Sequence, residues 1–304
     1  MTKKYLIERW EVEPQLRFIL NKINDLLKGG NVQSRINTYE FVDGKLDLRG
    51  IIINERTIAK LELQNADLTF SSFKDCWIEN SLFEKCNFEK VDFSKFSDHK
   101  NIFKECYFKN CKFNYASLGD GGTSFSECVF EDCNFFKTIF IRPEFVGVSF
   151  KNCKINSIDF FGSSFESCCF EGNLKDIWFR GGFPLQVDYS NYGIPKRNEM
   201  KNVSFVNAEL EDLTFSDNCD LSSVKIKSSD KYYKYERWKE RLEFLKMEDR
   251  NWSDKEKKEA EIFANTYLVH AKNQEWHIIN REDVERDHGK DIALKIINHL
   301  NNFQ

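Results

Sequence analysis

The sequence lacks several features that would define other classes of protein. It contains no run of about 18 apolar residues, which a membrane-spanning helix would need, and its first residues, MTKKYLIERWEVEP, are too charged for a secretory signal. It has no HExxH, P-loop, Rossmann, kinase or nucleophile-elbow pattern. The net charge is −4 and no basic stripe occurs, which argues against direct nucleic-acid binding. We therefore expect a cytosolic protein without membrane contact, cofactor, metal or catalytic residues.

What the sequence has is phenylalanine, 29 copies in 304 residues, arranged with a period of five. From Leu48 to Leu118 an apolar residue returns at every fifth position, and only Asp98 breaks the series. Two extra residues around GDGG (119–122) reset the phase, and the series then resumes over 125–170. Neither the helical period of 3.6 nor the strand period of two explains this spacing, so the chain must turn a corner in each repeat.

The repeated positions define a predicted core. Its aromatic members include Phe73, Phe83, Phe88, Phe103, Phe108, Phe113, Phe130, Phe135, Phe150 and Phe165. Two residues before each repeated position lies a smaller inward position, and eight of the ten cysteines occupy it: Cys76, Cys86, Cys106, Cys111, Cys128, Cys133, Cys153 and Cys168. Free cysteine packs as a small hydrophobe, whereas zinc needs four ligands that converge on one point. We predict that these thiols are buried, reduced and free of metal.

The segment NADLTFSSFKDCWIENSLFEKCNFEKVDF (65–93) resembles the pentapeptide-repeat family, and the resemblance extends over about residues 46–226. It implies a mainly β fold, a right-handed quadrilateral β-helix in which four repeats make one coil. About seven coils would then follow from the number of repeats. Residues 20 apart should stack on the same side of the rod.

Two short interruptions lie inside the repeats. SKFSDHKN (94–101) contains Asp98 and His99, and we interpret it as a surface corner because no triad pattern accompanies the histidine. LGDGGTS (118–124) could cradle a phosphate, but it lacks the Lys-Ser/Thr of a P-loop and no helix pattern follows. A bulged corner is the simpler interpretation.

A longer interruption, 173–202, is rich in aromatic residues and contains two of the four prolines. Long loops in compact domains are often functional, and aromatic and arginine side chains are typical interface anchors. The candidate partner-binding residues are Trp178, Phe179, Arg180, Phe183, Tyr189 and Tyr192. The alternative is a flap that folds back on the rod and covers its side.

The ends suggest three parts: an N-terminal helical cap (1–45), the β-helix (46–227) and an α-helical C-terminal domain (228–304). In the cap, Leu16, Leu20, Ile23 and Leu27 predict one amphipathic helix over 13–30. The C-terminal pattern predicts helices over 231–249 and from the capping box at Ser253 to about 272, and a third apolar stripe over 292–300. We expect Tyr235, Trp238, Leu242 and Leu245 to pack on the last coil, and the remaining stripe to form a homodimer.

Three functions remain open from the sequence. The first is a non-enzymatic scaffold that binds a protein partner through the rod surface, the 173–202 insertion and the helical tail. The second follows from FEKCNF and FEDCNF, which are similar to repeats of quinolone-resistance pentapeptide proteins; that resemblance implies a DNA mimic that binds a type II topoisomerase such as DNA gyrase. The third is an enzymatic tail, for which Asp283, Glu285, Asp287 and the tail histidines are the candidate residues.

Overall fold

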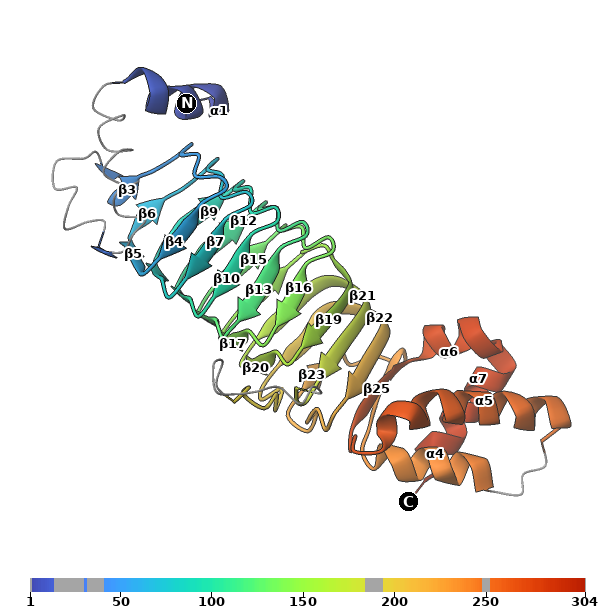
Figure 1. Ribbon diagram of the computed structural model, residues 1–304. Coiled ribbons are helices and arrows are strands. Elements are labelled where there is room, and N and C mark those ends of the chain that lie inside the picture. Colours follow the sequence, from blue (N-terminus) through green and yellow to red (C-terminus); the bar gives the residue numbers. More distant parts are fainter. Residues whose placement is uncertain (1, 14–29, 32–40, 184–193, 248–251, 304) are drawn as a thin grey trace.

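The computed structural model is a parallel β-solenoid of about nine turns with helices at both ends (Figure 1). It describes residues 2–13, 30–31, 41–183, 194–247 and 252–303. The turn count exceeds the expected seven because the solenoid includes residues 174–180, assigned above to an insertion, and because the first and last turns hold few residues of the regular repeat.

Each turn has four sides, which we name A to D in the order in which the chain visits them. Side A is a seven-stranded sheet of β1 (Gly30–Asn31), β5 (Leu61–Gln64), β8 (Leu82–Glu84), β11 (Ile102–Lys104), β14 (Ser124–Ser126), β17 (Glu144–Val146) and β20 (Ser164–Glu166). Side B holds β3 (Lys45–Asp47), β6 (Ala66–Asp67), β9 (Asn87–Glu89), β12 (Tyr107–Lys109), β15 (Val129–Glu131), β18 (Ser149–Lys151) and β23 (Lys225–Ile226), with β2 (Phe41–Val42) antiparallel to β3.

Side C is joined by single parallel bridges that run from Ile52 to Lys154. Side D holds β4 (Thr57–Ala59), β7 (Trp77–Glu79), β10 (Ser97–His99), β13 (Ser117–Asp120), β16 (Ile139–Ile141) and β19 (Ile155–Phe161). In the last turns β21 (Cys169–Arg180) and β22 (Ser204–Ser216) run continuously from side B to side D.

The corners between sides depend on a regular change of backbone conformation. The residue two places after each central apolar residue usually has a positive φ, as in Lys85, Lys90 and Lys95 with φ of 54°, 55° and 56°. This left-handed conformation costs a non-glycine residue roughly 1–2 kcal/mol. The cost recurs at corner after corner, so the packing inside the rod must offset it.

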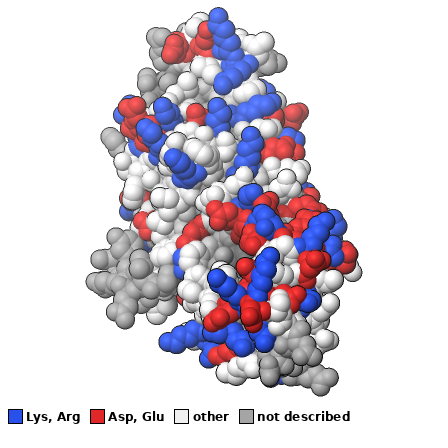
Figure 2. All heavy atoms as spheres, turned by 90° about the vertical axis from the view of Figure 1, so that its right-hand side faces the viewer, with Lys and Arg blue, Asp and Glu red and all other residues white. Residues whose placement is uncertain are grey.

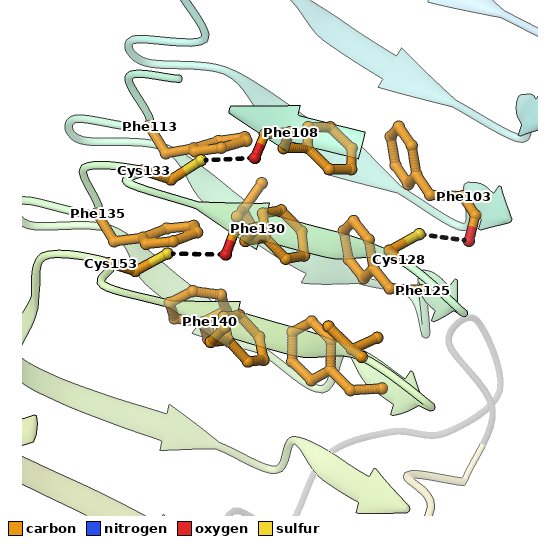
Figure 3. Close-up of a cluster of buried hydrophobic side chains, with 14 of the residues drawn as sticks. Phe103, Phe108, Phe113, Phe125, Cys128, Phe130, Cys133, Phe135, Phe140 and Cys153 are labelled. Atoms are coloured by element: carbon orange, nitrogen blue, oxygen red, sulfur yellow. Dashed lines mark hydrogen bonds between the residues drawn. The ribbon is translucent and has the colours of Figure 1, made fainter. Parts of the chain in front are cut away.

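Inside the rod, phenylalanine rings stack directly above one another (Figure 3). On side B, Phe108 lies parallel to Phe88 and Phe130, with ring centroids 4.7 and 4.6 Å away. Each ring also meets its neighbours on the adjoining sides edge to face, as Phe103 meets Phe108 at 5.8 Å. All ten phenylalanines of the predicted core are at most 3% exposed. Both arrangements are favourable for aromatic pairs beyond the area they bury.

The small inward position has a second role that follows from the coil geometry. The Cys128, Cys133 and Cys153 thiols donate to the backbone carbonyls of Phe103, Phe108 and Phe130 in the preceding turn, at 3.3 to 3.4 Å (Figure 3). Thr138 and Ser71 occupy the same position and form the same bond, to the carbonyls of Phe113 and Leu48. The position therefore holds small side chains, and these thiols and hydroxyls add a hydrogen bond between turns.

At the N-terminal end, helix α1 (Lys3–Val12) covers the first turn. Arg9 donates two hydrogen bonds to the buried carboxylate of Asp47, at 2.7 and 2.8 Å, and the Trp10 ring belongs to the rod core. Burial tends to raise the pKa of Asp47, but hydrogen bonds from Arg49 and Arg9 hold it well below its ordinary value. The helix predicted over 13–30 lies almost entirely outside the described residues.

The described part of the C-terminal segment combines a two-stranded antiparallel sheet with four helices. Strands β24 (Tyr232–Tyr235) and β25 (His277–Asn280) pair antiparallel, and helices α4 (Trp238–Met247), α5 (Asp254–Ala271), α6 (Arg281–His288) and α7 (Lys290–Asn301) pack beside them. The capping box at Ser253 and Glu256 opens α5 as the sequence predicted. The helix expected from residue 231 begins at Trp238 instead, because residues 232–235 find a strand partner that is distant in sequence.

The tail covers the open edge of the last turn: side chains of the tail form hydrogen bonds with backbone groups of that turn. The Tyr232 hydroxyl accepts from the Leu210 amide, and Asn280 donates to the Leu210 carbonyl. Gln274 pairs with both the amide and the carbonyl of Cys219. These bonds block the pairing that an uncovered strand edge would offer to other chains.

The expected packing of the tail needs correction. Tyr235, Trp238, Leu242 and Leu245 are buried, but in the tail's own core, while Tyr232 and Ile278 extend the rod core into the tail. The stripe expected to form a dimer, Ile292, Ile296, Ile297 and Leu300, is buried as well. A four-helix segment needs its own core, and these stripes supply it. No described helix is long and apolar enough to cross a membrane.

Candidate interaction surfaces

Two of the residues predicted to bind a partner are part of the solenoid itself. Phe179 is fully buried, and its ring stacks between those of Phe160 and Phe215 at 5.2 and 5.6 Å. Trp178 precedes it on β21, is half-buried, and donates from its indole nitrogen to the Ser216 hydroxyl at 2.8 Å. The prediction for Phe179 is therefore wrong, because the solenoid continues through residue 180 with its repeat shifted by one residue, which pairs Phe179 with Phe160.

Arg180 is fixed on the side of the rod. Its guanidinium carbon lies 3.6 Å from the centre of the Trp178 ring, and the group forms ion pairs with Asp159 and Asp217. Phe183 packs edge to face on Phe161, at 4.7 Å. These side chains cover the rod, as the flap interpretation of this segment supposed. Tyr189 and Tyr192 lie outside the described residues.

A different set of exposed aromatic residues lies midway along the rod, and the sequence analysis missed it. Tyr115 and Phe136 are 54% and 50% exposed, their rings meet edge to face at 5.7 Å, and the Lys137 ammonium lies over both. Around the next corner Ile139 is 59% exposed. We name this surface the aromatic–lysine patch; it consists of Lys112, Tyr115, Phe136, Lys137, Ile139 and Lys154.

The coil register brings the patch together. Lys112, Asn134 and Lys154 are neighbours in successive turns of side C, and the Tyr115 amide donates to the Phe136 carbonyl. Within the described residues, Lys112, Lys137 and Lys154 form no ion pair with a carboxylate, although Asp92 is the register neighbour of Lys112 in the preceding turn. One signal was available: Phe136 follows Phe135 at a position that polar residues fill in most repeats.

Charges on the rest of the rod are mixed. Side A and its following corner carry a carboxylate in most turns: Glu62, Glu84, Glu105, Glu127, Glu144 and Glu166. Ion pairs join Glu84 with Lys104, Glu105 with Lys85, and Glu166 with Lys201. In the view of Figure 2, basic and acidic side chains are interspersed over the surface. Within the described residues, lysines therefore offset part of the negative charge of side A.

Asp98, the residue that breaks the repeat, points into the rod and is 1% exposed, not placed at a surface corner as expected. Its Oδ1 accepts from the Gly119 amide at 2.6 Å and from the Thr123 hydroxyl at 2.9 Å, so it holds the GDGG bulge in place. Its Oδ2 has no partner among the described atoms. Burial raises the pKa of Asp98 to about 7, against the effect of these two hydrogen bonds.

The ten cysteines are all free, and all are buried except Cys169, which is half-buried. Burial raises the pKa of the Cys168 thiol to about 12. A neutral thiol is neither a good nucleophile nor a metal ligand, and Cys168 packs in the core of the rod. No group of three His, Cys, Asp or Glu side chains within the described part of the chain is placed to hold a metal ion.

The five-residue period, the four-sided coils and the stacked interior define this protein as a repeat β-solenoid with capped ends. No protein-family model matches the sequence, and no curated protein matches it significantly. Solved structures similar to it are pentapeptide repeat proteins, as the repeats indicated.

One is HetL, a pentapeptide repeat protein involved in heterocyst differentiation regulation from the cyanobacterium Nostoc sp. strain PCC 7120; it is 11% identical, the match covers 63% of this chain and 93% of HetL, and the TM-score is 0.33. Another is full-length QnrB1, a plasmid-mediated fluoroquinolone resistance protein, with 16% identity, coverage of 60% and 94%, and a TM-score of 0.26. A third is Rfr23 from the cyanobacterium Cyanothece 51142, with 13% identity, coverage of 34% and 86%, and a TM-score of 0.29.

Proposed function

We propose that this protein is a non-catalytic scaffold that binds a protein partner through the aromatic–lysine patch. The observation that carries the proposal is the exposure of Tyr115, Phe136 and Ile139 beside lysines that lack ion pairs. Large exposed apolar groups rimmed by polar residues are typical of interaction sites, and aromatic side chains dominate binding energy at interfaces. The ten free cysteines support the reducing cytosol as its location.

The charge of the patch specifies the partner's chemistry. Three lysines surround the two rings, so an acidic segment that carries an apolar side chain fits better than a basic one. The type II topoisomerase alternative requires an acidic surface that imitates a DNA duplex. The paired glutamates of side A weaken that reading, because each paired lysine cancels a charge that would imitate a phosphate.

The test places a photoreactive amino acid at position 136 and, as a control, at position 52, where Ile52 is also exposed on side C (47%). We expect position 136 alone to cross-link one protein, identified by mass spectrometry. The purified partner should then lose at least tenfold affinity for Phe136→Asn, keep its affinity for Ile52→Asn, and bind more weakly as salt increases. Equal affinity for both variants would refute the patch as the interface, and inhibition of purified DNA gyrase by the intact protein would favour the alternative.

A further inference from the structure

A second site lies where the rod meets the tail, far in sequence from the patch. Here the final turn and the helices enclose a cavity of about 270 Å³. Asp212 and Phe215 of β22 line its rod side, and Trp238 of α4, Tyr267 of α5 and His277 of β25 line its tail side. This volume is close to the lower limit of small-molecule sites.

His277 is the unusual member of this lining. The residue is 2% exposed, and neither of its ring nitrogens has a hydrogen-bond partner within the described protein. Burial lowers the pKa of His277 to about 3, so the ring is neutral and carries one donor and one acceptor. A buried polar group without a partner destabilises the folded state, and such groups are rare in folded proteins.

Aromatic rings surround the imidazole. The Trp238 ring lies parallel to it with centroids 4.9 Å apart, and Tyr267 and Phe215 meet it at steep angles, 5.0 and 5.7 Å away. Both faces of the Trp238 ring are covered, by His277 and by Tyr235, whereas a phenol such as that of Tyr267 attracts cations through the negative quadrupole of its face. The walls therefore favour a ligand that is both apolar in its body and positively charged.

The charged lining has the same preference. Asp176, Asp212 and Asp287 line the cavity, and no lysine or arginine is found among its described lining residues. Arg286, which lies outside the lining, forms bonds with Asp212 and Asp287 and offsets part of their charge. Asp176 is an exposed carboxylate of this lining, so anions are disfavoured.

We propose that this junction cavity binds a small organic ammonium compound. The ammonium group would lie near the carboxylates and the ring of Tyr267, and His277 would supply a hydrogen-bond acceptor and a donor. The ligand would contact both the rod and the tail, because the lining comes from both. Binding would therefore stabilise the folded junction by mass action.

The experiment compares three probes of one size on the full chain: 1,4-diaminobutane, 1,4-butanediol and succinate. Calorimetry and thermal unfolding should detect saturable binding, one molecule per chain, of the diamine alone. His277→Phe should abolish that binding while it leaves the unfolding temperature unchanged or higher, since it removes two unpaired nitrogens. Asp176→Asn should weaken binding severalfold.

Asp43→Asn is the matched control. Like Asp176, Asp43 is an exposed carboxylate in the left-handed backbone conformation, but it lies far from the cavity. It should leave binding unchanged. Failure of the diamine to bind saturably overturns the proposal, and so does equal binding of the diol. Undiminished binding to a folded His277→Phe variant overturns it as well, because the diamine would then be an adventitious surface ligand.

Discussion

Phe108 illustrates how single residues stabilise the rod, since its ring has a parallel ring above it and another below. We predict that Phe108→Ala lowers the free energy of unfolding by about 3–5 kcal/mol, because a large aromatic group leaves a cavity that the rigid coil cannot close. Phe108→Leu should cost much less. Denaturant unfolding measures both variants. Equally small losses would show that the residues repeated at every fifth position do not face inward.

Asp98 makes stability depend on pH. Its folded-state pKa of about 7 lies above its ordinary value of 3.8, so the folded protein retains a proton that the unfolded chain releases. The unfolded state therefore binds fewer protons between these values, and stability falls as pH rises from about 4 to 7. Below pH 4 the group has no effect on the slope.

Asp98→Asn should remove this dependence, because Asn keeps the oxygen that accepts from Gly119 but does not titrate. As pH rises from 4 to 7, the unfolding free energy of the parent should therefore fall relative to that of Asp98→Asn. Identical slopes for the two proteins over this interval would mean that Asp98 is ionised in the rod.

At the scale of elements, the rod's last turn depends on side chains of the tail. Gln274 pairs both the buried amide and the buried carbonyl of Cys219, at 3.0 and 2.6 Å. Gln274→Ala should destabilise the protein by roughly 2–3 kcal/mol, because it leaves both backbone groups unpaired. The same substitution should raise the rate of hydrogen exchange at the Cys219 amide.

The neighbouring Asn273 is exposed and provides the control for this cap. Asn273→Ala should change neither stability nor exchange at Cys219 by a measurable amount. If Gln274→Ala behaves in the same way, the last turn does not need the tail to cover its edge.

At the scale of the molecule, each turn of the solenoid contacts only the turns before and after it, so the first and last turns each need a cover. Truncation after Lys227 removes the cover of the last turn and exposes Leu210 and Cys219. We predict that the truncated rod self-associates without limit, as measured by light scattering. A truncated rod that stays soluble and monodisperse would show that the tail is not a cap.

Homodimerisation of the intact chain stays a proposal, and light scattering of the full-length protein tests it too. The α7 stripe cannot form the interface because it is buried. A two-fold pair would have to use other surface, and cyclic pairs are the commonest arrangement for soluble oligomers.

Much of the fold could be predicted from the sequence alone. The period of five, the inward phenylalanines and the small position occupied by Cys106 and its counterparts are local patterns, because each repeat makes the same corner wherever it occurs. Stacking then follows from repetition, as Phe83 pairs with Phe103 one turn later. The capping box at Ser253 is local for the same reason.

The surfaces and the tail were decided only by the tertiary structure. Tyr115 and Phe136 meet because a two-residue bulge sets the register between their turns, and outward residues obey no repeat. Phe179 joined the core because the chain re-entered the solenoid register. His277 and Phe215, 62 positions apart, share a cavity because β25 pairs with the distant strand β24 and the tail docks on the rod, and neither contact leaves a periodic pattern in the sequence.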